Sequence, residues 1–281
     1  MRRIQSPHGL QQLTSRWRRQ GRTIGFVPTM GALHAGHLRL IQQARRETDR
    51  VVVSIFVNPL QFTERRDYAR YPRPLTRDAG LARAAGADVL FVPNARQLYP
   101  HDFQTTVEVT RVTRRWEGLS RPGHFRGVTT IVATLLNLAQ PDLLYVGEKD
   151  AQQARAIQQL VHDLHWNLRV RVLPTVRESG GLAMSSRNVH LAPSERRRAR
   201  ALYEALQAGK WLIECGERRR SRLLRAMQQI IRRTSGARLD YLAVVDPMTL
   251  EPVRQVRGPV RLLIAVRLGS IRLIDTLIAR P

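Results

Sequence analysis

The chain has 281 residues, enough for two domains with buried cores, and carries 47 basic against 22 acidic residues, a formal charge of +25. Its single cysteine excludes an intrachain disulfide, and no apolar run is long enough for a signal peptide or a membrane span. We therefore expect a cytoplasmic protein with no membrane partner.

Apolar runs that predict buried strands alternate with segments of helical spacing over residues 8–173. In chain order we expect a helix at 8–20, a strand at 23–28, a helix at 38–44, a strand at 51–57, a helix at 75–85, a strand at 88–92, a helix at 128–138, a strand at 142–146, a helix at 151–164 and a strand at 168–173. This alternation is typical of βαβ units whose parallel sheet is covered on both faces.

The pattern changes after Pro174. A long arginine-rich helix is predicted from about Pro193 and a second over roughly 217–234, followed by short strands near 240–245 and 260–266. We therefore expect an α/β domain over 1–175 and a smaller C-terminal α+β domain over 176–281.

The first predicted strand leads into a glycine-containing turn that carries two histidines. The turn runs from Pro28 to His37, with His34 just before the next helix and His37 in its first turn. Free N–H groups at a helix start favour phosphate, and the helix dipole disfavours a charged imidazole. We therefore expect two neutral histidines that donate hydrogen bonds to a polyphosphate, the alternative being one helix cap and one packed surface residue.

A lysine at the end of the fourth predicted strand is the second candidate. Only two of the 47 basic residues are lysines, Lys149 and Lys210, so most basic positions in this chain are arginine. A compact ammonium differs from a planar guanidinium in reach and geometry, so a retained lysine marks a position where arginine does not serve. Lys149 lies at a strand end and is expected to be functional, whereas Lys210 lies in a predicted helix and is expected to be surface.

Six ordered blocks between residues 24 and 190 carry a family resemblance. His34 to His37 reads His-x-Gly-His, which resembles the signature of the Rossmann-like nucleotidyltransferase superfamily. The whole set resembles the pantothenate synthetase family: Val27–His37, Phe56–Phe62, Tyr71–Arg73, Ser120–Val128, Gly147–Asp150 and Met184–Asn188. A single short motif is weak evidence, but six blocks in family order are specific.

The resemblance implies a reaction, substrates and site residues. Pantoate would be activated by ATP, with Mg²⁺, as a pantoyl adenylate, and β-alanine would displace AMP to give pantothenate. The catalytic residues would be His34, His37 and Lys149, with His37 as proton donor, and the family also implies a homodimer. ATP would be bound by Met30, Gly31, Ala32, Leu33, His34, Ala35, Gly36, His37, Gly147, Glu148, Lys149, Asp150, Val176, Met184, Ser185, Ser186 and Arg187. Gln61 and Gln153 would bind pantoate or β-alanine, and Asp78 would contact the metal.

Three positions depart from the family pattern, and two other functions remain open. Ala35 and Gly180 stand where acidic residues are frequent, and Ala151 stands where an aromatic residue is common. An adenylyl or cytidylyl transferase of the same superfamily would instead keep the nucleotide in its product. A nucleic-acid-binding protein is disfavoured, because the arginines are dispersed and not interleaved with aromatic residues.

Overall fold

The computed structural model describes residues 1–281, and the chain divides into two compact units. The first comprises Met1–Gly147 and Gln153–Pro174, and the second comprises Glu148–Gln152 and Thr175–Pro281. None of the helices combines the length and the apolar character that a membrane-spanning segment needs.

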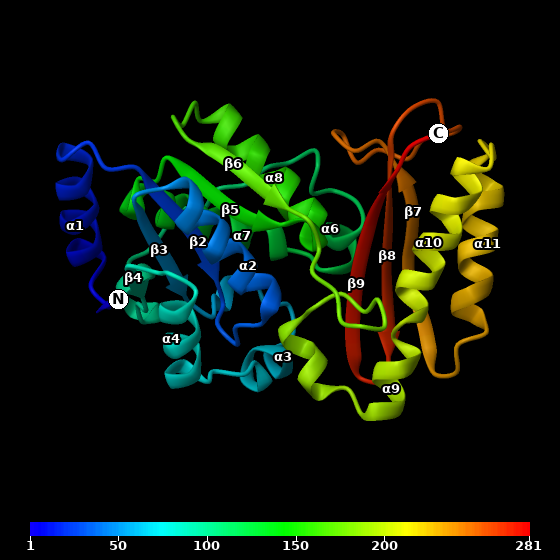
Figure 1. Cartoon of the computed structure of the whole chain (residues 1–281), viewed down its shortest axis with the longest axis horizontal. Coiled ribbons are helices and arrows are strands. Elements are labelled where there is room, and N and C mark those ends of the chain that lie inside the picture. Colours follow the sequence, from blue (N-terminus) through cyan, green and yellow to red (C-terminus); the bar gives the residue numbers. More distant parts are fainter. The chain divides into compact units, whose positions relative to one another are not determined.

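The first unit is built on the predicted parallel sheet, which has six strands in the order β1-β4-β3-β2-β5-β6 (Figure 1). The strands are β1 Arg2–Ile4, β2 Ile24–Thr29, β3 Arg50–Ile55, β4 Val89–Phe91, β5 Leu143–Gly147 and β6 Arg169–Leu173, and every neighbouring pair is parallel. The carboxyl ends of these strands therefore meet at one edge of the sheet.

Helices bury both faces of this sheet, as the continuous apolar strands predict. Val27 and Val53 point to a core shared with Leu40 and Ile41 of α2, and their neighbours Phe26 and Val52, also fully buried, point to the opposite face. Helices α1 and α7 contact each other and β2. The helices of this unit are α1 Pro7–Arg19, α2 Ala35–Glu47, α3 Arg65–Arg70, α4 Leu75–Ala84, α5 Ala95–Leu98, α6 Glu117–Ser120, α7 His124–Ala139 and, from Gln153 on, α8 Ala151–Asp163, with the 3-10 turn η1 Pro59–Gln61. The 3-10 turn η2 Glu148–Asp150, directly before α8, belongs to the second unit.

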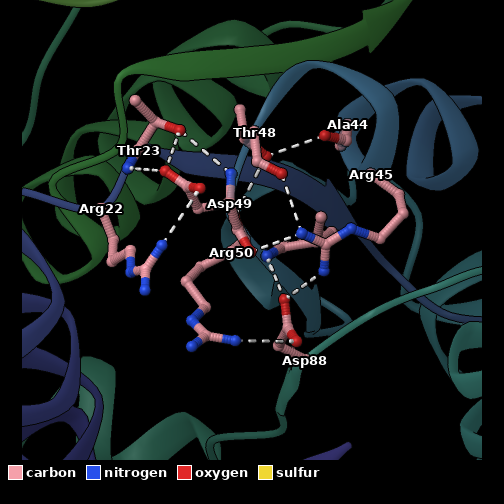
Figure 2. A network of polar contacts seen from close by, with 9 residues as sticks. Arg22, Thr23, Ala44, Arg45, Thr48, Asp49, Arg50 and Asp88 are labelled. Atoms are coloured by element: carbon pink, nitrogen blue, oxygen red, sulfur yellow. Dashed lines mark hydrogen bonds and ion pairs between the residues drawn. The ribbon is translucent and has the colours of Figure 1, made fainter.

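A polar network closes the amino ends of β2, β3 and β4 (Figure 2). Asp49 accepts a hydrogen bond from the Thr23 N–H at 2.8 Å. Asp88 accepts from the Val51 N–H and from the Arg45 guanidinium, both at 2.8 Å. These carboxylates satisfy backbone donors that the parallel sheet leaves unpaired. Structural hydrogen bonds thus occupy this edge, opposite to the edge where the candidate residues follow the strands.

The second unit is a three-stranded antiparallel sheet, β7-β8-β9, with α10 and α11 lying along it (Figure 1). Leu206 of α10, Met227 of α11 and Leu262 of β8 belong to its core and are fully buried. Its elements are η3 Ser186–His190, α9 Pro193–Arg198, α10 Ala201–Glu214, α11 Arg220–Arg232, β7 Ala237–Val245, β8 Val260–Leu268 and β9 Ile271–Ala279.

The structure differs from the sequence-based expectation in several elements and in the division into units. The sequence did not predict the strands β1 and β9 or the short helices α3, α5 and α6. The single long helix expected from Pro193 is wrong, because the chain turns between α9 and α10. The segment Glu148–Gln152, expected in the first domain, clusters with the second unit, where Arg261 pairs with Glu148 at 3.2 Å.

Candidate functional site

The two histidines of the turn after β2 form a capping box at the start of α2. His34 is the N-cap residue, and its Nδ1 accepts the Gly36 N–H at 3.2 Å. The Nδ1 of His37 accepts the His34 N–H at 3.4 Å, and the two rings stack with centroids 4.0 Å apart. Because both Nδ1 atoms accept, a neutral ring carries its proton on Nε2. In its neutral form each imidazole thus has its hydrogen-bond donor at Nε2.

Asp78, on α4, anchors this turn. It is 1% exposed, and its two carboxylate oxygens accept the N–H groups of Ala32 at 2.7 Å and Leu33 at 2.8 Å. Gly31 and Ala32 have φ values of +83° and +49°, and the left-handed region is costly for alanine. The two charge-assisted hydrogen bonds offset that cost and fix the course of the backbone.

One expectation about the turn is therefore wrong. The N–H groups at the helix start were expected to be free for phosphate, but that of Gly36 donates to His34 Nδ1. The N–H groups of Ala32, Leu33 and His34, just before the helix, also donate within the protein.

Gln61, in the turn η1 after β3, has its side-chain amide held from both ends. Its Oε1 accepts from Asn58 Nδ2 at 3.1 Å, and its Nε2 lies 2.9 Å from Met30 Sδ. Asn58 is 1% exposed and also donates to the Gly127 carbonyl at 3.0 Å. The Gln61 amide is thus fixed beside the turn that carries the histidines.

The backbone of Gln61 is fixed as well, by α7 and the loop before it. Its carbonyl lies 2.7 Å from His124 Nδ1 and accepts from Arg121 Nη2 at 3.2 Å. A carbonyl only accepts, so His124 carries its proton on Nδ1. Gly127 lets α7 approach this turn, because a Cβ there would lie 2.3 Å from the Leu60 carbonyl oxygen.

Lys149 lies in η2, directly after β5, and belongs to the second unit. Its Nζ donates to the Met184 carbonyl at 3.2 Å. The N–H of Met184 in turn bonds the Val176 carbonyl at 2.9 Å. The lysine is therefore tied to the residue that immediately precedes Ser185, Ser186 and Arg187.

The segment from Thr175 to His190 is held in place by a buried ion pair. Arg177 binds Asp275 of β9 through two hydrogen bonds of 2.6 and 3.0 Å, and its guanidinium lies 4.0 Å from the centroid of the Tyr203 ring. Asn188 donates to the Ala183 carbonyl at 3.1 Å. Ser185 caps η3 by accepting the Arg187 N–H at 3.3 Å. The serine–arginine segment thus has a defined conformation within the second unit.

The remaining predicted residues fall into the same two groups. In the first unit, Met30, Ala35, Gly36 and Gln153 are at least partly exposed, and the buried Leu33 packs into the core. Gly147 ends β5, and Glu148 and Asp150 flank Lys149 in η2. At Gly180 the place of a side chain is taken by Arg200, whose Nε would lie 2.0 Å from a Cβ. The candidate residues therefore form two groups, one in each unit.

Sequence reasoning assigned no role to Asn58, Tyr99, His124, Arg121 or Arg177. Asn58 directly follows the strand predicted at 51–57, and an amide at that place lies at the carboxyl edge of the sheet. Tyr99 and Arg177 act through partners 41 and 98 residues away. Asn58, Arg121 and His124 also lie in blocks that carry the family resemblance, whereas Tyr99 and Arg177 had no signal in the sequence.

Comparison with known proteins indicates the family of the chain. The family model described as pantoate-beta-alanine ligase matches residues 2–278. The pantothenate synthetase of Heliobacterium modesticaldum is 50% identical over 278 residues, with 99% of each chain covered.

Solved structures agree as well. A pantothenate synthetase from Thermus thermophilus superposes with a TM-score of 0.94 at 46% identity, covering 99% of both chains. A pantoate-beta-alanine ligase from Francisella tularensis, described as complexed with beta-gamma ATP and beta-alanine, gives a TM-score of 0.83 at 36% identity and covers 99% of this chain and 97% of that one. The Rossmann-like α/β fold with its smaller C-terminal α+β unit is confirmed, and the chain belongs to the pantoate–β-alanine ligase family.

Proposed function

We propose that this chain condenses pantoate with β-alanine at the expense of ATP, forming pantothenate, AMP and pyrophosphate. Membership of the family supports the reaction. One structural observation supports the assignment of residues to it. The capping box holds the two imidazoles at the carboxyl end of β2 through their Nδ1 atoms, so that the neutral rings carry their proton on Nε2. Donors of this kind stabilise charge that develops on a leaving pyrophosphate.

The reaction requires no nucleophile from the protein. The carboxylate of pantoate attacks the α-phosphorus of ATP, and the bond to pyrophosphate breaks. The amine of β-alanine then attacks the acyl carbon of the adenylate, loses a proton, and AMP leaves with the electron pair of the broken C–O bond. Catalysis of this type rests on positioning and charge neutralisation.

The residues divide this work between them. His34 and His37 donate to the phosphates, with His37 as proton donor, and the backbone from Met30 to Gly36 lines the nucleotide. Lys149, Ser185, Ser186 and Arg187 hold the phosphates from the second unit, while Gly147, Glu148, Asp150, Val176 and Met184 contact the rest of ATP. Gln61 and Gln153 hold pantoate. Because Lys149 is bonded to Met184, the ammonium and the serine–arginine segment form one group.

Magnesium fits this site as a companion of the nucleotide. The structure contains no cluster of three or more His, Cys, Asp or Glu side chains that could hold a metal ion. Mg²⁺ is usually bound through substrate phosphates and one or two carboxylates, and Asp78 remains the proposed carboxylate. When bound, the ion would neutralise phosphate charge. A homodimer and a cytoplasmic location complete the proposal, as the family resemblance implies.

The proposal is tested by the products and by Lys149. Protein incubated with ATP, Mg²⁺, pantoate and β-alanine should yield pantothenate and AMP by mass spectrometry. Pantoate-dependent exchange of labelled pyrophosphate into ATP should fall by orders of magnitude in Lys149→Ala. The exchange should also fall strongly in Lys149→Arg, because a planar guanidinium does not replace a compact ammonium.

The other lysine provides the matched control. Lys210 lies on α10, with its Nζ 3.7 Å from Glu214, and Lys210→Ala should keep full exchange. Near-normal exchange in Lys149→Ala would count against the assignment. Nucleotide retained in the product, with no AMP release on adding β-alanine, would instead indicate an adenylyl transferase.

A further inference from the structure

A line of side-chain hydrogen bonds runs from Tyr99 to Gln61 through a buried amide. The Tyr99 hydroxyl donates to Asn58 Oδ1 at 2.8 Å, and Asn58 Nδ2 donates to Gln61 Oε1 at 3.1 Å. Asn58 is 1% exposed and Gln61 is 8% exposed, so water competes poorly for these groups.

The partners of Asn58 leave only one orientation for its amide. The Gly127 carbonyl accepts but cannot donate, so the nitrogen of the Asn58 side chain faces it at 3.0 Å. The Leu60 N–H donates but cannot accept, so Oδ1 faces it at 3.3 Å. Asn58 therefore presents a donor to Gln61, and Oε1 of Gln61 accepts that donor. The NH₂ group of Gln61 is left to point to the other side, where Met30 lies.

Tyr99 supplies the shortest hydrogen bond to Asn58. Burial raises the pKa of the Tyr99 phenol, so this hydroxyl stays a proton donor at neutral pH. Its ring packs 5.0 Å from the ring of Phe103 and 6.0 Å from that of Phe56, centroid to centroid. The ring thus has its own packing, and the hydroxyl can be removed without removing the ring.

From this geometry we infer that Tyr99 is a positioning residue for pantoate. It acts through Asn58 to hold Gln61 with its NH₂ group turned to the substrate. The side-chain NH₂ group of Gln61 is a hydrogen-bond donor, so it would bind an acceptor oxygen of the hydroxy acid. The inference rests on the proposed function, in which Gln61 holds pantoate.

The test is Tyr99→Phe in steady-state kinetics with each substrate varied in turn. Loss of one neutral hydrogen bond should raise the KM for pantoate about five-fold, with the KM for ATP and kcat nearly unchanged. Tyr145→Phe is the matched control, since the Tyr145 hydroxyl donates to Glu47 at 2.9 Å elsewhere in the same unit. The control should leave the KM for pantoate at the wild-type value.

A double-mutant cycle shows whether Tyr99 acts through its hydrogen bond to Asn58 or through general packing. If Tyr99 acts through Asn58, then Tyr99→Phe should have no further effect on the KM for pantoate in an Asn58→Ala background. Asn58→Leu, of similar volume, serves as a second background if the alanine variant folds poorly. Equal effects of Tyr99→Phe in the wild-type and Asn58-substituted backgrounds, or equal rises in the KM of all substrates, would overturn the inference.

Wild-type protein that forms no pantothenate would contradict the proposed function itself. If the wild-type protein is active and Tyr99→Phe has a normal KM for pantoate, only the inference that Tyr99 positions Gln61 through Asn58 is contradicted.

Discussion

At the scale of single residues, Asp78 is a buried carboxylate that holds the turn carrying the two histidines in place. Both of its oxygens accept backbone N–H groups of the turn, and it is 1% exposed. A carboxylate used in this way holds the left-handed Ala32 in place whether or not a metal is present. A further contact to Mg²⁺ would have to use its remaining lone pairs.

We expect Asp78→Asn to weaken ATP binding by disturbing the turn. One accepting oxygen becomes an NH₂ group that faces a backbone N–H, which leaves a buried donor unsatisfied at a cost of about 1–3 kcal/mol. The KM for ATP in pyrophosphate exchange should rise at least ten-fold. The melting temperature without ligand or metal should also fall.

The melting temperature distinguishes the two roles of Asp78. A pure metal ligand would leave the stability of the ligand-free protein unchanged and would raise the Mg²⁺ requirement instead. Asp102→Asn, in an exposed loop, is the control and should change neither quantity.

At the scale of elements, a glutamate joins the end of α2 to the sheet. Glu47 accepts from the Tyr145 hydroxyl of β5 at 2.9 Å and from Arg171 of β6 at 2.7 and 3.2 Å. The hydrogen bonds from Arg171, with others from Gln43 and Tyr145, lower the pKa of the Glu47 carboxyl to about 2. The helix that starts at the histidine turn is thereby fixed at its far end.

This lowered pKa predicts a pH-dependent stability. The ionised Glu47 stabilises the folded state above the ordinary pKa of 4.5, and that contribution is lost as the pH falls toward 2. Glu47→Gln should therefore lower the free energy of unfolding by about 1–2 kcal/mol at pH 7. The difference from wild type should shrink below about pH 4.5.

Urea denaturation at pH 7, 4 and 3 measures this difference. Glu108→Gln, in an exposed loop, should follow wild type throughout. A constant difference between Glu47→Gln and wild type at all three pH values would show that the charge of Glu47 is not the cause.

The elements that the sequence predicted are those whose signal is local. Strands β2 and β3 contain the apolar runs that predicted them, and all but one position of each is buried. Strand β1 has three residues, two of them exposed arginines, and exists because β4 pairs with it. Strand β9 contains Asp275, which is buried beside Arg177, and a buried charge breaks the apolar pattern that marks a strand.

In the candidate site, too, the sequence predicted the residues with a local signal and missed those that depend on distant contacts. His34, His37 and Lys149 were identified because they follow strands, and the parallel topology brings strand ends to one edge. Gln61 was implied by the family resemblance, and it too follows a strand. The network around Gln61 was not identified, because Tyr99 and His124 reach it across 41 and 63 residues of chain. Strand alternation predicts which edge is used, but it carries no information on which distant side chains meet there.

At the scale of the whole molecule, the chain crosses between its units within the site residues. The strand β5 belongs to the first unit, but Glu148–Gln152 belongs to the second, together with the serine–arginine segment. Lys149 therefore shares its unit with Ser185 to Arg187 and not with the histidine turn. Any displacement of one unit would carry the lysine and this segment together.

The formal charge of +25 acts on the molecule as a whole. Most of the arginines contact no substrate in the proposed reaction, yet their summed field attracts polyanions over roughly one Debye length, about 10 Å at 0.1 M salt. ATP carries several negative charges, pantoate carries one, and β-alanine is a zwitterion. The three substrates therefore differ in their expected response to salt.

We expect the KM for ATP to rise several-fold between 50 and 500 mM ionic strength, because screening removes the long-range attraction. The KM for pantoate should rise less, and that for β-alanine should stay constant. Steady-state kinetics in potassium chloride and in potassium acetate at matched ionic strength separates screening from competition. Screening depends on ionic strength alone, whereas an anion that competes at the phosphate-binding residues would act differently in the two salts. A KM for ATP that stays constant across this range would mean that direct contacts from the histidine turn and from Lys149 determine ATP binding. The surface charge would then have no effect on it.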